Sequence, residues 1–338
     1  MKKKLNYLIT LMVIIISASI IGILLFVLLN GKKSYFLVEF YNPDKVSDGT
    51  TLFADLSNEE EPRIVEVDME GNVVWEYILP DDIKEYTNPG FDVELLPSNN
   101  ILFLAPQKGI YEINRAGTIV WSYLDDKASH DADRLPNGNT IFIWGGSDTS
   151  EDLQAKEVNT AGTIVWSWKA KDHYYYDPYK NISMQGWTHA NAVTRFPNGN
   201  TAINFRNFNL TVIVNNTGQV LKELNWTTLG DDPHEPEFHP NGNIIIALQW
   251  TAPDQVLEIK NTTSNIIWTY HRDNLTFTRD ADRLANNNTL IVGVVGNSPK
   301  IFEVTSDGEI VWQLAVRGKC LSTRSPGWFY KAERIYYP

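Results

Sequence analysis

Cysteine is almost absent from this chain of 338 residues, in which Cys320 stands alone. No disulfide framework and no cysteine-based zinc site can therefore form within one chain. Basic residues are scarce beyond the N-terminus. Five of the 29 Lys and Arg residues and none of the 41 Asp and Glu residues precede residue 34, which leaves residues 34–338 with a net charge of −17. Because phosphate binding depends on neutralisation by Lys and Arg, nucleic acid is not an expected partner.

Helical patterning is also missing from most of the chain. After residue 34 no segment combines the helical spacing of apolar residues with end caps. Short β-branched and aromatic runs between turn residues take its place, for example Ile141–Ile143 and Ile244–Ile246. These runs predict strands, so the fold class expected for residues 51–338 is all-β.

One long apolar run precedes this part. Leu8–Leu29 contains no charged residue and follows three lysines. About 20 apolar residues span a bilayer, so residues 1–33 are interpreted as a cytoplasmic tip and a transmembrane anchor, and residues 34–50 as a linker. A cleaved signal peptide with a cut near residues 17–19 is the alternative. The lysines before the run favour a globular domain outside the cell, and the localisation expected is a single-pass cell-membrane protein. Seven glycosylation sequons agree with an outside location: Asn181, Asn209, Asn215, Asn225, Asn261, Asn274 and Asn287.

A repeat fills the rest of the chain. A turn followed by a strand ending in tryptophan recurs at Trp75, Trp121, Trp166, Trp268 and Trp312, with a degenerate copy at Lys222. Pro-Asn-Gly phrases lie between these copies, and they favour hairpins because Asn and Gly tolerate positive φ. Four strands in each unit of about 45 residues are typical of a propeller blade. The sequence therefore predicts a six-bladed β-propeller.

The two ends of the repeat indicate how the ring closes. Residues 51–79 supply three strands of a blade but no inner strand, whereas Ala332–Ile335 resembles the inner strands of other units. The last residues are expected to complete the first blade. The repeated tryptophans are interpreted as packing between blades.

The candidate site lies where the inner strands begin. His130 and His234 each lie six residues before the proline of a Pro-Asn-Gly turn. The equivalent position, which we call the column, holds Phe91, Arg279 and Tyr330 in other units, and His189 lies two residues before it in its own unit. Counting back through the hairpin places Arg206 opposite Asn191, two residues after His189. Imidazole and guanidinium groups that converge in a channel suit a tetrahedral oxyanion such as sulfate or phosphate. A zinc ion held by three histidines is the alternative, which the nearby arginines disfavour.

These motifs resemble those of the bacterial and archaeal arylsulfate sulfotransferase family. The resemblance rests on four phrases in this order: Ser129–Asp133, Trp187–Val193, Asn204–Asn207 and His234–Pro236. It implies a six-bladed propeller that moves a sulfuryl group from a phenolic sulfate to another phenol through a covalent histidine. His234 is then the implied nucleophile, and His130, His189 and Arg206 are implied sulfuryl ligands, with Asn191 as a further one. The single Cys320 departs from periplasmic members, which carry a cysteine pair.

Arg279 is also expected to bind substrate, because it occupies the same position in its repeat unit as His130 and His234 do in theirs. No cofactor is expected: the transfer needs no metal, and no glycine-rich loop follows a strand to hold a nucleotide sulfate. Two other functions remain open, namely a non-catalytic membrane-anchored propeller that binds a ligand or protein, and a hydrolase or lyase that uses the same site. The insertion at residues 172–187 is rich in tyrosine and is interpreted as an aromatic wall over the mouth of the channel.

Overall fold

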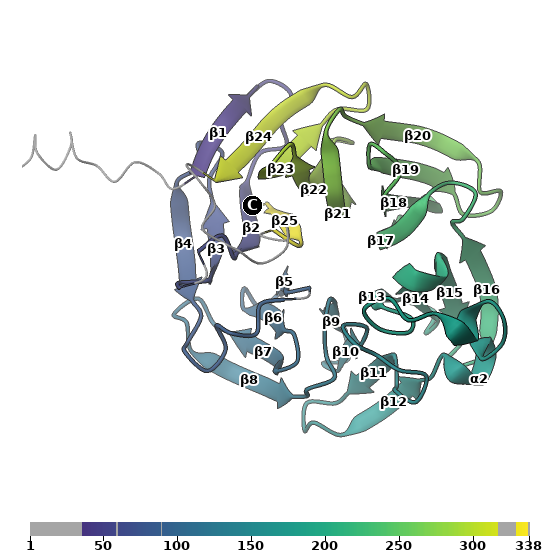
Figure 1. The fold of residues 1–338 in the computed structure, drawn as a ribbon. Coiled ribbons are helices and arrows are strands. Elements are labelled where there is room, and N and C mark those ends of the chain that lie inside the picture. Colours follow the sequence, from purple (N-terminus) through teal and green to yellow (C-terminus); the bar gives the residue numbers. More distant parts are fainter. Residues whose placement is uncertain (1–35, 59, 89, 317–328, 337–338) are drawn as a thin grey trace, which may run out of the picture. The chain divides into compact units, whose positions relative to one another are not determined.

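The computed structural model describes residues 36–58, 60–88, 90–316 and 329–336. Six antiparallel sheets in this part form a ring around a central axis (Figure 1). We refer to the space enclosed by the inner strands as the channel. The all-β six-bladed propeller predicted from the repeat is therefore confirmed. The expected transmembrane helix at residues 8–29 lies outside the described residues. Within those residues, no helix has the length and apolar character needed to cross a membrane.

Each blade has an inner strand at the channel and an outer strand at the rim (Figure 1). From inside to outside, the first blade consists of β25 (Ala332–Ile335), β2 (Thr50–Asp55), β3 (Arg63–Val67) and β4 (Val73–Ile78). The second blade consists of β5 (Asp92–Leu95), β6 (Ile101–Ala105), β7 (Gly109–Ile113) and β8 (Ile119–Leu124). The third blade consists of β9 (Ala132–Arg134), β10 (Thr140–Ile143), β11 (Ala155–Val158) and β12 (Ile164–Trp168). The fourth blade consists of β13 (Ala190–Arg195), β14 (Thr201–Phe205), β15 (Leu210–Val214) and β16 (Val220–Asn225). The fifth blade consists of β17 (Asp231–Phe238), β18 (Asn243–Gln249), β19 (Gln255–Lys260) and β20 (Ile266–His271). The sixth blade consists of β21 (Leu275–Arg283), β22 (Thr289–Val295), β23 (Ser298–Val304) and β24 (Ile310–Val316). Short helical turns are α2 (Lys171–Tyr174), η1 (Tyr179–Asn181) and η2 (Arg206–Phe208).

The C-terminal strand closes the ring. β25 pairs antiparallel with β2, with Ala332 opposite Phe53 and Ile335 opposite Thr50. This is the pairing that the incomplete first repeat predicted. The linker expected over residues 34–50 needs a correction, because Phe36–Tyr41 forms strand β1 on the outer edge of the sixth blade, paired with β24. Glu39, Phe40 and Tyr41 are all exposed, so buried and exposed positions do not alternate clearly in this strand. Its partner lies more than 270 residues away in the chain.

The repeated tryptophans link neighbouring blades. Each indole N–H donates to a backbone carbonyl in the turn of the next blade, as with Trp75 to Arg115 at 2.8 Å and Trp312 to Met69 at 2.9 Å. An arginine also lies over each ring, for instance Arg134 at 4.4 Å from the centre of Trp121. The indoles therefore contribute hydrogen bonds and cation–π contacts between blades as well as apolar packing.

Carboxylates join the inner strands around the channel. Acidic side chains on one inner strand accept backbone N–H groups from the inner strand of the next blade. The pairs are Asp92 to Ala132, Asp131 to Val193, Asp280 to Ala332, Glu94 to Arg134, Glu237 to Arg283 and Glu333 to Leu95. A charged acceptor makes a stronger hydrogen bond than a neutral one, so part of the acidic excess of this chain has a structural role.

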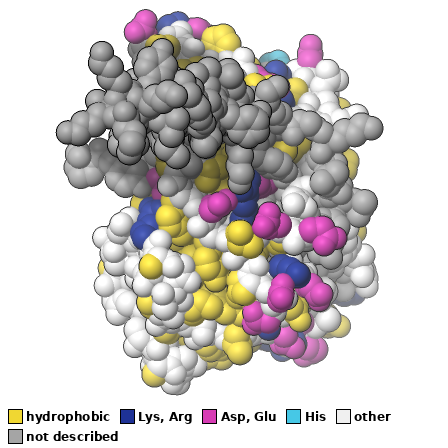
Figure 2. Space-filling view, turned by 90° about the vertical axis from the view of Figure 1, so that its left-hand side faces the viewer, with side chains coloured by type: hydrophobic (Ala, Val, Ile, Leu, Met, Phe, Trp, Pro, Cys, Tyr) yellow, Lys and Arg dark blue, Asp and Glu magenta, His cyan; other side chains and the backbone are white. Residues whose placement is uncertain are grey.

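The outer strands are amphipathic. β4 alternates half-buried and exposed residues with the period of two that a strand imposes, and Val74 and Ile78 are exposed. Figure 2 shows the side of the propeller that carries β4 in Figure 1, where apolar and acidic side chains reach the surface. The chemistry-bearing side chains lie instead at the channel.

Candidate active site

Histidines and arginines from neighbouring blades meet at one mouth of the channel. The rings of His130 and His189 lie edge to face with their centres 4.8 Å apart, and His130 also contacts Tyr330 at 5.7 Å. The guanidinium of Arg279 lies 5.5 Å from the centre of the Tyr330 ring. His130, Arg279 and Tyr330, which share the column position in the sequence, therefore lie close together with His189 in the structure.

His234 is buried in β17 with one ring nitrogen bonded and the other free. Its Nδ1 lies 2.9 Å from the backbone carbonyl oxygen of Asp232, and its Nε2 has no hydrogen-bond partner among the described residues. A carbonyl oxygen can only accept, so Nδ1 carries the proton. Burial, followed by the positive charge of Arg279, lowers the pKa of His234 well below its usual value. The ring is therefore neutral near pH 7, with a lone pair on Nε2.

His130 has the opposite tautomer. Its Nδ1 lies 2.8 Å from the hydroxyl of Ser129, and that hydroxyl oxygen accepts the backbone N–H groups of Gly145 and Gly146. The Ser129 proton is thus directed to His130 Nδ1, which leaves the ring proton on Nε2. This Nε2–H is buried, and no residue in the described part of the chain accepts it. Gly90 makes room for the ring, because a Cβ there would lie 2.6 Å from it.

His189 is held from the preceding blade by Asp148, whose carboxylate accepts the backbone N–H groups of Trp187, Thr188 and His189. His189 Nδ1 lies 2.7 Å from the carbonyl oxygen of Gln185 and therefore carries the ring proton. Burial, together with the charge of Arg206, lowers the pKa of His189 to about 3.

Arg206 reaches the mouth by a register different from the expected one. A bulge between Ala190 and Ala192 makes Asn204, rather than Arg206, the close neighbour of Asn191, and Arg206 N–H bonds the carbonyl of His189 at 3.3 Å. The guanidinium is held by the Met184 carbonyl at 3.1 Å. The expected pairing of Arg206 with Asn191 assumed a regular hairpin. A bulge adds one unpaired residue to a strand and shifts the pairing of all residues beyond it.

Asn191 lies behind the nucleophile candidate. Its amide donates to the carbonyl oxygen of Pro233 at 2.9 Å, and Asn204 donates to both its Oδ1 at 2.6 Å and that same carbonyl at 2.8 Å. The side chain of Asn191 is fully buried. These bonds fix the backbone next to His234, so the geometry gives Asn191 a positioning role where the resemblance implied a sulfuryl contact.

The tyrosine-rich insertion differs from the aromatic wall expected over the mouth. Tyr174 and Tyr179 pack on Phe208, and the Tyr174 hydroxyl donates to Glu223. α2 lies at the outer edge of the ring (Figure 1). At the end of the insertion, the carbonyls of Met184 and Gln185 accept hydrogen bonds from Arg206 and His189.

Several bulky residues at the site have left-handed backbone conformations. Such conformations are uncommon for residues other than glycine and concentrate at functional sites. The residues are His130, His189, Asp232, Glu235, Trp250 and Phe277. Asp232 and Glu235, which sequence reasoning missed, flank His234 on β17. Proximity in sequence to the histidine was the only signal available for them.

The donor set suits an anion. In the part of the chain that the structure describes, no three His, Cys, Asp or Glu side chains are arranged to hold a metal ion. At the mouth, by contrast, two buried donors, His130 Nε2–H and Arg279 Nε–H, lack partners within the same described ranges, as does the lone pair of His234 Nε2. Buried polar groups are usually paired, so such unpaired groups indicate a missing ligand. Arg206 lies beside them, with Nε 4.0 Å from the Asp232 carboxylate.

Comparisons with known proteins identify the family of this chain and support its propeller fold. The model of the arylsulfotransferase family (ASST) matches residues 38–232, and the chain belongs to this family. A search of curated proteins finds no match. A protein of unknown function from Bacteroides caccae is similar in structure, with a TM-score of 0.60, 19% identity, and coverage of 85% of this chain and 98% of that one.

Two lyase structures are also similar. A streptogramin B lyase has a TM-score of 0.53 at 15% identity, and the matched region covers 83% of this chain and 88% of the lyase chain. A catalytically inactive variant of virginiamycin B lyase from Staphylococcus aureus, with quinupristin, has a TM-score of 0.51 at 15% identity, covering 81% and 87%. At these identities the likeness concerns the propeller fold alone.

Proposed function

We propose that this protein moves a sulfuryl group from an aryl sulfate to a phenol through a covalent sulfohistidine at His234. Membership of the arylsulfotransferase family supports the reaction class. The observation that carries the mechanism is the hydrogen bond from His234 Nδ1 to the Asp232 carbonyl, which directs a buried lone pair on Nε2 to the unpaired donors of the mouth.

In the first step Nε2 attacks the sulfur of the aryl sulfate. An N–S bond forms, and the S–O bond to the aryl group breaks with its electron pair passing to the phenolate oxygen. The imidazole becomes positive, and its Nδ1–H remains bonded to the Asp232 carbonyl, which stabilises that charge. Covalent catalysis of this kind divides one difficult transfer into two easier ones.

The sulfuryl oxygens are held by Arg206, Arg279 and the Nε2–H of His130. Their charges and dipoles are already in place before the reaction, which is usually the largest contribution to stabilising a transition state of this type. Asn191 acts through Pro233 by fixing the backbone of the nucleophile. In this mechanism Arg206, Arg279 and His130 contact the sulfuryl oxygens, and Asn191 does not.

The second step reverses the first with a different phenol. The acceptor oxygen attacks sulfur, and the N–S electron pair returns to Nε2 of His234. The proton of the acceptor passes to His189, whose Nε2 carries a lone pair because its Nδ1 donates to the Gln185 carbonyl. His189 then gives this proton to the phenolate that leaves in the next turnover. The Nε2 of His130 already carries the ring proton and cannot accept another, so His189 is the proton carrier. A bound sulfuryl anion favours the protonated form of this imidazole.

An assay with 4-nitrophenyl sulfate, with and without added phenol, tests this function. We expect 4-nitrophenol release to depend on the acceptor, with one phenyl sulfate formed for each 4-nitrophenol released, because the covalent group needs a phenol to leave. Release at the same rate without phenol would identify a hydrolase. No release with any phenolic acceptor would favour a propeller that only binds its ligand.

We further propose that residues 8–29 anchor the protein in the cell membrane with the propeller on the extracytoplasmic side. The uncharged run after three lysines and the sequons support this orientation. Protease added to intact cells should release a fragment of nearly full propeller size. A propeller that is cut only after the cells are lysed would contradict the orientation.

A further inference from the structure

Trp250 presents an aromatic surface at the mouth side of the fifth blade. Its side chain is 64% exposed, and its backbone has a φ of 57°. The indole is nonetheless held in place, with Nε1 donating to the Asp232 carboxylate at 2.5 Å and the ring meeting Phe277 edge to face at 5.5 Å. A large aromatic ring that is both exposed and fixed is typical of a binding surface.

This aromatic pair is directly connected to the proposed nucleophile. Asp232, which holds Trp250 through its carboxylate, holds His234 through its backbone carbonyl. Phe277 lies under the guanidinium of Arg279 at 5.9 Å. A ring placed on Trp250 and Phe277 therefore lies beside the groups that bind the sulfuryl oxygens.

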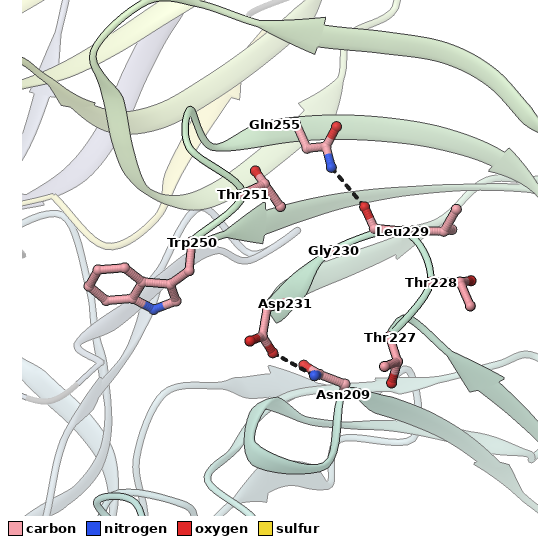
Figure 3. A pocket seen from close by; sticks show the side chains of 9 residues that line it. All are labelled: Asn209, Thr227, Thr228, Leu229, Gly230, Asp231, Trp250, Thr251 and Gln255. Carbon is pink, nitrogen blue, oxygen red and sulfur yellow. Dashed lines mark hydrogen bonds between the residues drawn. The ribbon is translucent and has the colours of Figure 1, made fainter.

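A polar cavity adjoins Trp250. Its volume is about 470 Å³, within the range of small-molecule sites. Figure 3 shows eight lining residues grouped around it, with the Trp250 indole projecting away at one side. They are Asn209, Thr227, Thr228, Leu229, Gly230, Asp231, Thr251 and Gln255. The dashed lines in Figure 3 mark Asn209 donating to Asp231 and Gln255 donating to the Leu229 carbonyl.

The charge of this cavity differs from that of the mouth. Among the described residues, its lining contains hydroxyl and amide groups and the carboxylate of Asp231, and no Lys, Arg or His. Such a lining can bind a neutral or cationic hydrogen-bonding group, and it repels an anion. The cavity is therefore not a second sulfate site.

We infer that Trp250, Phe277 and this cavity form the acceptor subsite, which selects phenols bearing a neutral or cationic hydrogen-bonding arm. The inference rests on the proposed function and names its acceptor class. The phenol ring packs on Trp250 and Phe277 with its hydroxyl at the sulfuryl group, and the arm enters the cavity toward Asp231. The fixed indole lowers the ordering cost of binding.

Three acceptors of similar size test the arm. They are 4-(2-hydroxyethyl)phenol, 4-propylphenol, which has the same number of non-hydrogen atoms, and (4-hydroxyphenyl)acetate. We expect kcat/KM for sulfuryl transfer to be roughly fivefold higher for the hydroxyethyl compound than for the propyl one, since one hydrogen bond contributes about 1 kcal/mol. The acetate should be the poorest acceptor, and Asp231→Asn should reduce the discrimination against it.

Variants of Trp250 test the ring. Trp250→Ala should raise KM for all three phenols by roughly tenfold, as expected for loss of an aromatic contact. Trp250→Phe keeps a ring but loses the bond to Asp232, so it should keep most of the affinity and separate ring packing from positioning. Tyr175→Ala is the matched control, because Tyr175 is an exposed aromatic residue of the insertion. Equal effects of Trp250→Ala and Tyr175→Ala would overturn the subsite.

Calorimetric binding to the His234→Asn protein separates this inference from the proposed function. It measures the affinity for the three phenols without turnover. If the wild-type protein transferred no sulfuryl group while the three affinities kept the expected order, the subsite would stand and the transfer reaction would be rejected. Transfer activity combined with equal affinities for the hydroxyethyl, propyl and acetate compounds would reject the subsite alone.

Discussion

We expect the His234→Asn variant to fold normally and to lose sulfuryl transfer by about a thousandfold or more, as enzymes do when their nucleophile is removed. The asparagine amide can replace Nδ1 as the donor to the Asp232 carbonyl, so the buried hydrogen bond is kept. It has no lone pair on nitrogen to replace that of Nε2. Mass spectrometry of a quenched reaction should find a sulfuryl adduct on the peptide containing His234 in the wild-type protein and none in the variant.

His271→Asn is the control for this experiment, because His271 is exposed at the end of β20. It should transfer at the wild-type rate. An adduct on the peptide that contains His130 or His189 would move the nucleophile to another blade. Full transfer by His234→Asn would remove the covalent mechanism.

The propeller could be predicted because its repeat is local. Five of the six blades have a tryptophan in the outer strand, and Pro-Asn-Gly or related turns recur between these strands. Such turns need only a few adjacent residues. Ring closure followed from the same logic, since β2 lacked an inner partner that Ala332–Ile335 could supply. β1 was missed because its pairing with β24 joins the two ends of the chain.

The site was predicted as a set of residues but not as a geometry. The period of the repeat brought His130, His234 and Arg279 to one column. The tautomers depend on contacts that no spacing records: two N–H groups on the Ser129 hydroxyl, and a left-handed backbone at Asp232 that places its carbonyl below His234. Asp148 holds His189 from another blade, and a sequence pattern carries no signal for such a contact.

Lys331→Met is expected to destabilise the propeller by roughly 3–5 kcal/mol, as measured when one partner of a buried ion pair is removed. Lys331 Nζ lies within 3.2 Å of carboxylate oxygens of Asp92, Asp131 and Glu235, and all four side chains are largely buried. Burial alone would lower the pKa of Lys331, but these three carboxylates raise it well above its usual value. Methionine keeps the apolar stem and leaves three acids without a cation.

The loss of stability in Lys331→Met should depend on pH, because the carboxyl groups around Lys331 have shifted pKa values. Burial raises the pKa of Asp92 and of Glu235 in the folded protein. A carboxyl group with a raised folded pKa binds more protons folded than unfolded, so its contribution to stability is greatest at low pH and decreases as pH rises toward the folded pKa. Without Lys331 these pKa values rise further. The loss in Tm should therefore be largest near pH 8 and smaller near pH 5, where protonation removes the unpaired charges.

Lys45→Met provides the matched comparison for thermal unfolding. Lys45 pairs with Glu309 at 2.5 Å, but both side chains are about half exposed, and such surface pairs contribute at most about 1 kcal/mol. Its small effect should not change between pH 5 and pH 8 in the way expected for Lys331→Met. A Lys331→Met protein as stable as Lys45→Met would show that the channel carboxylates do not need this cation. A large loss that is equal at both pH values would instead point to packing, because a packing defect does not depend on protonation.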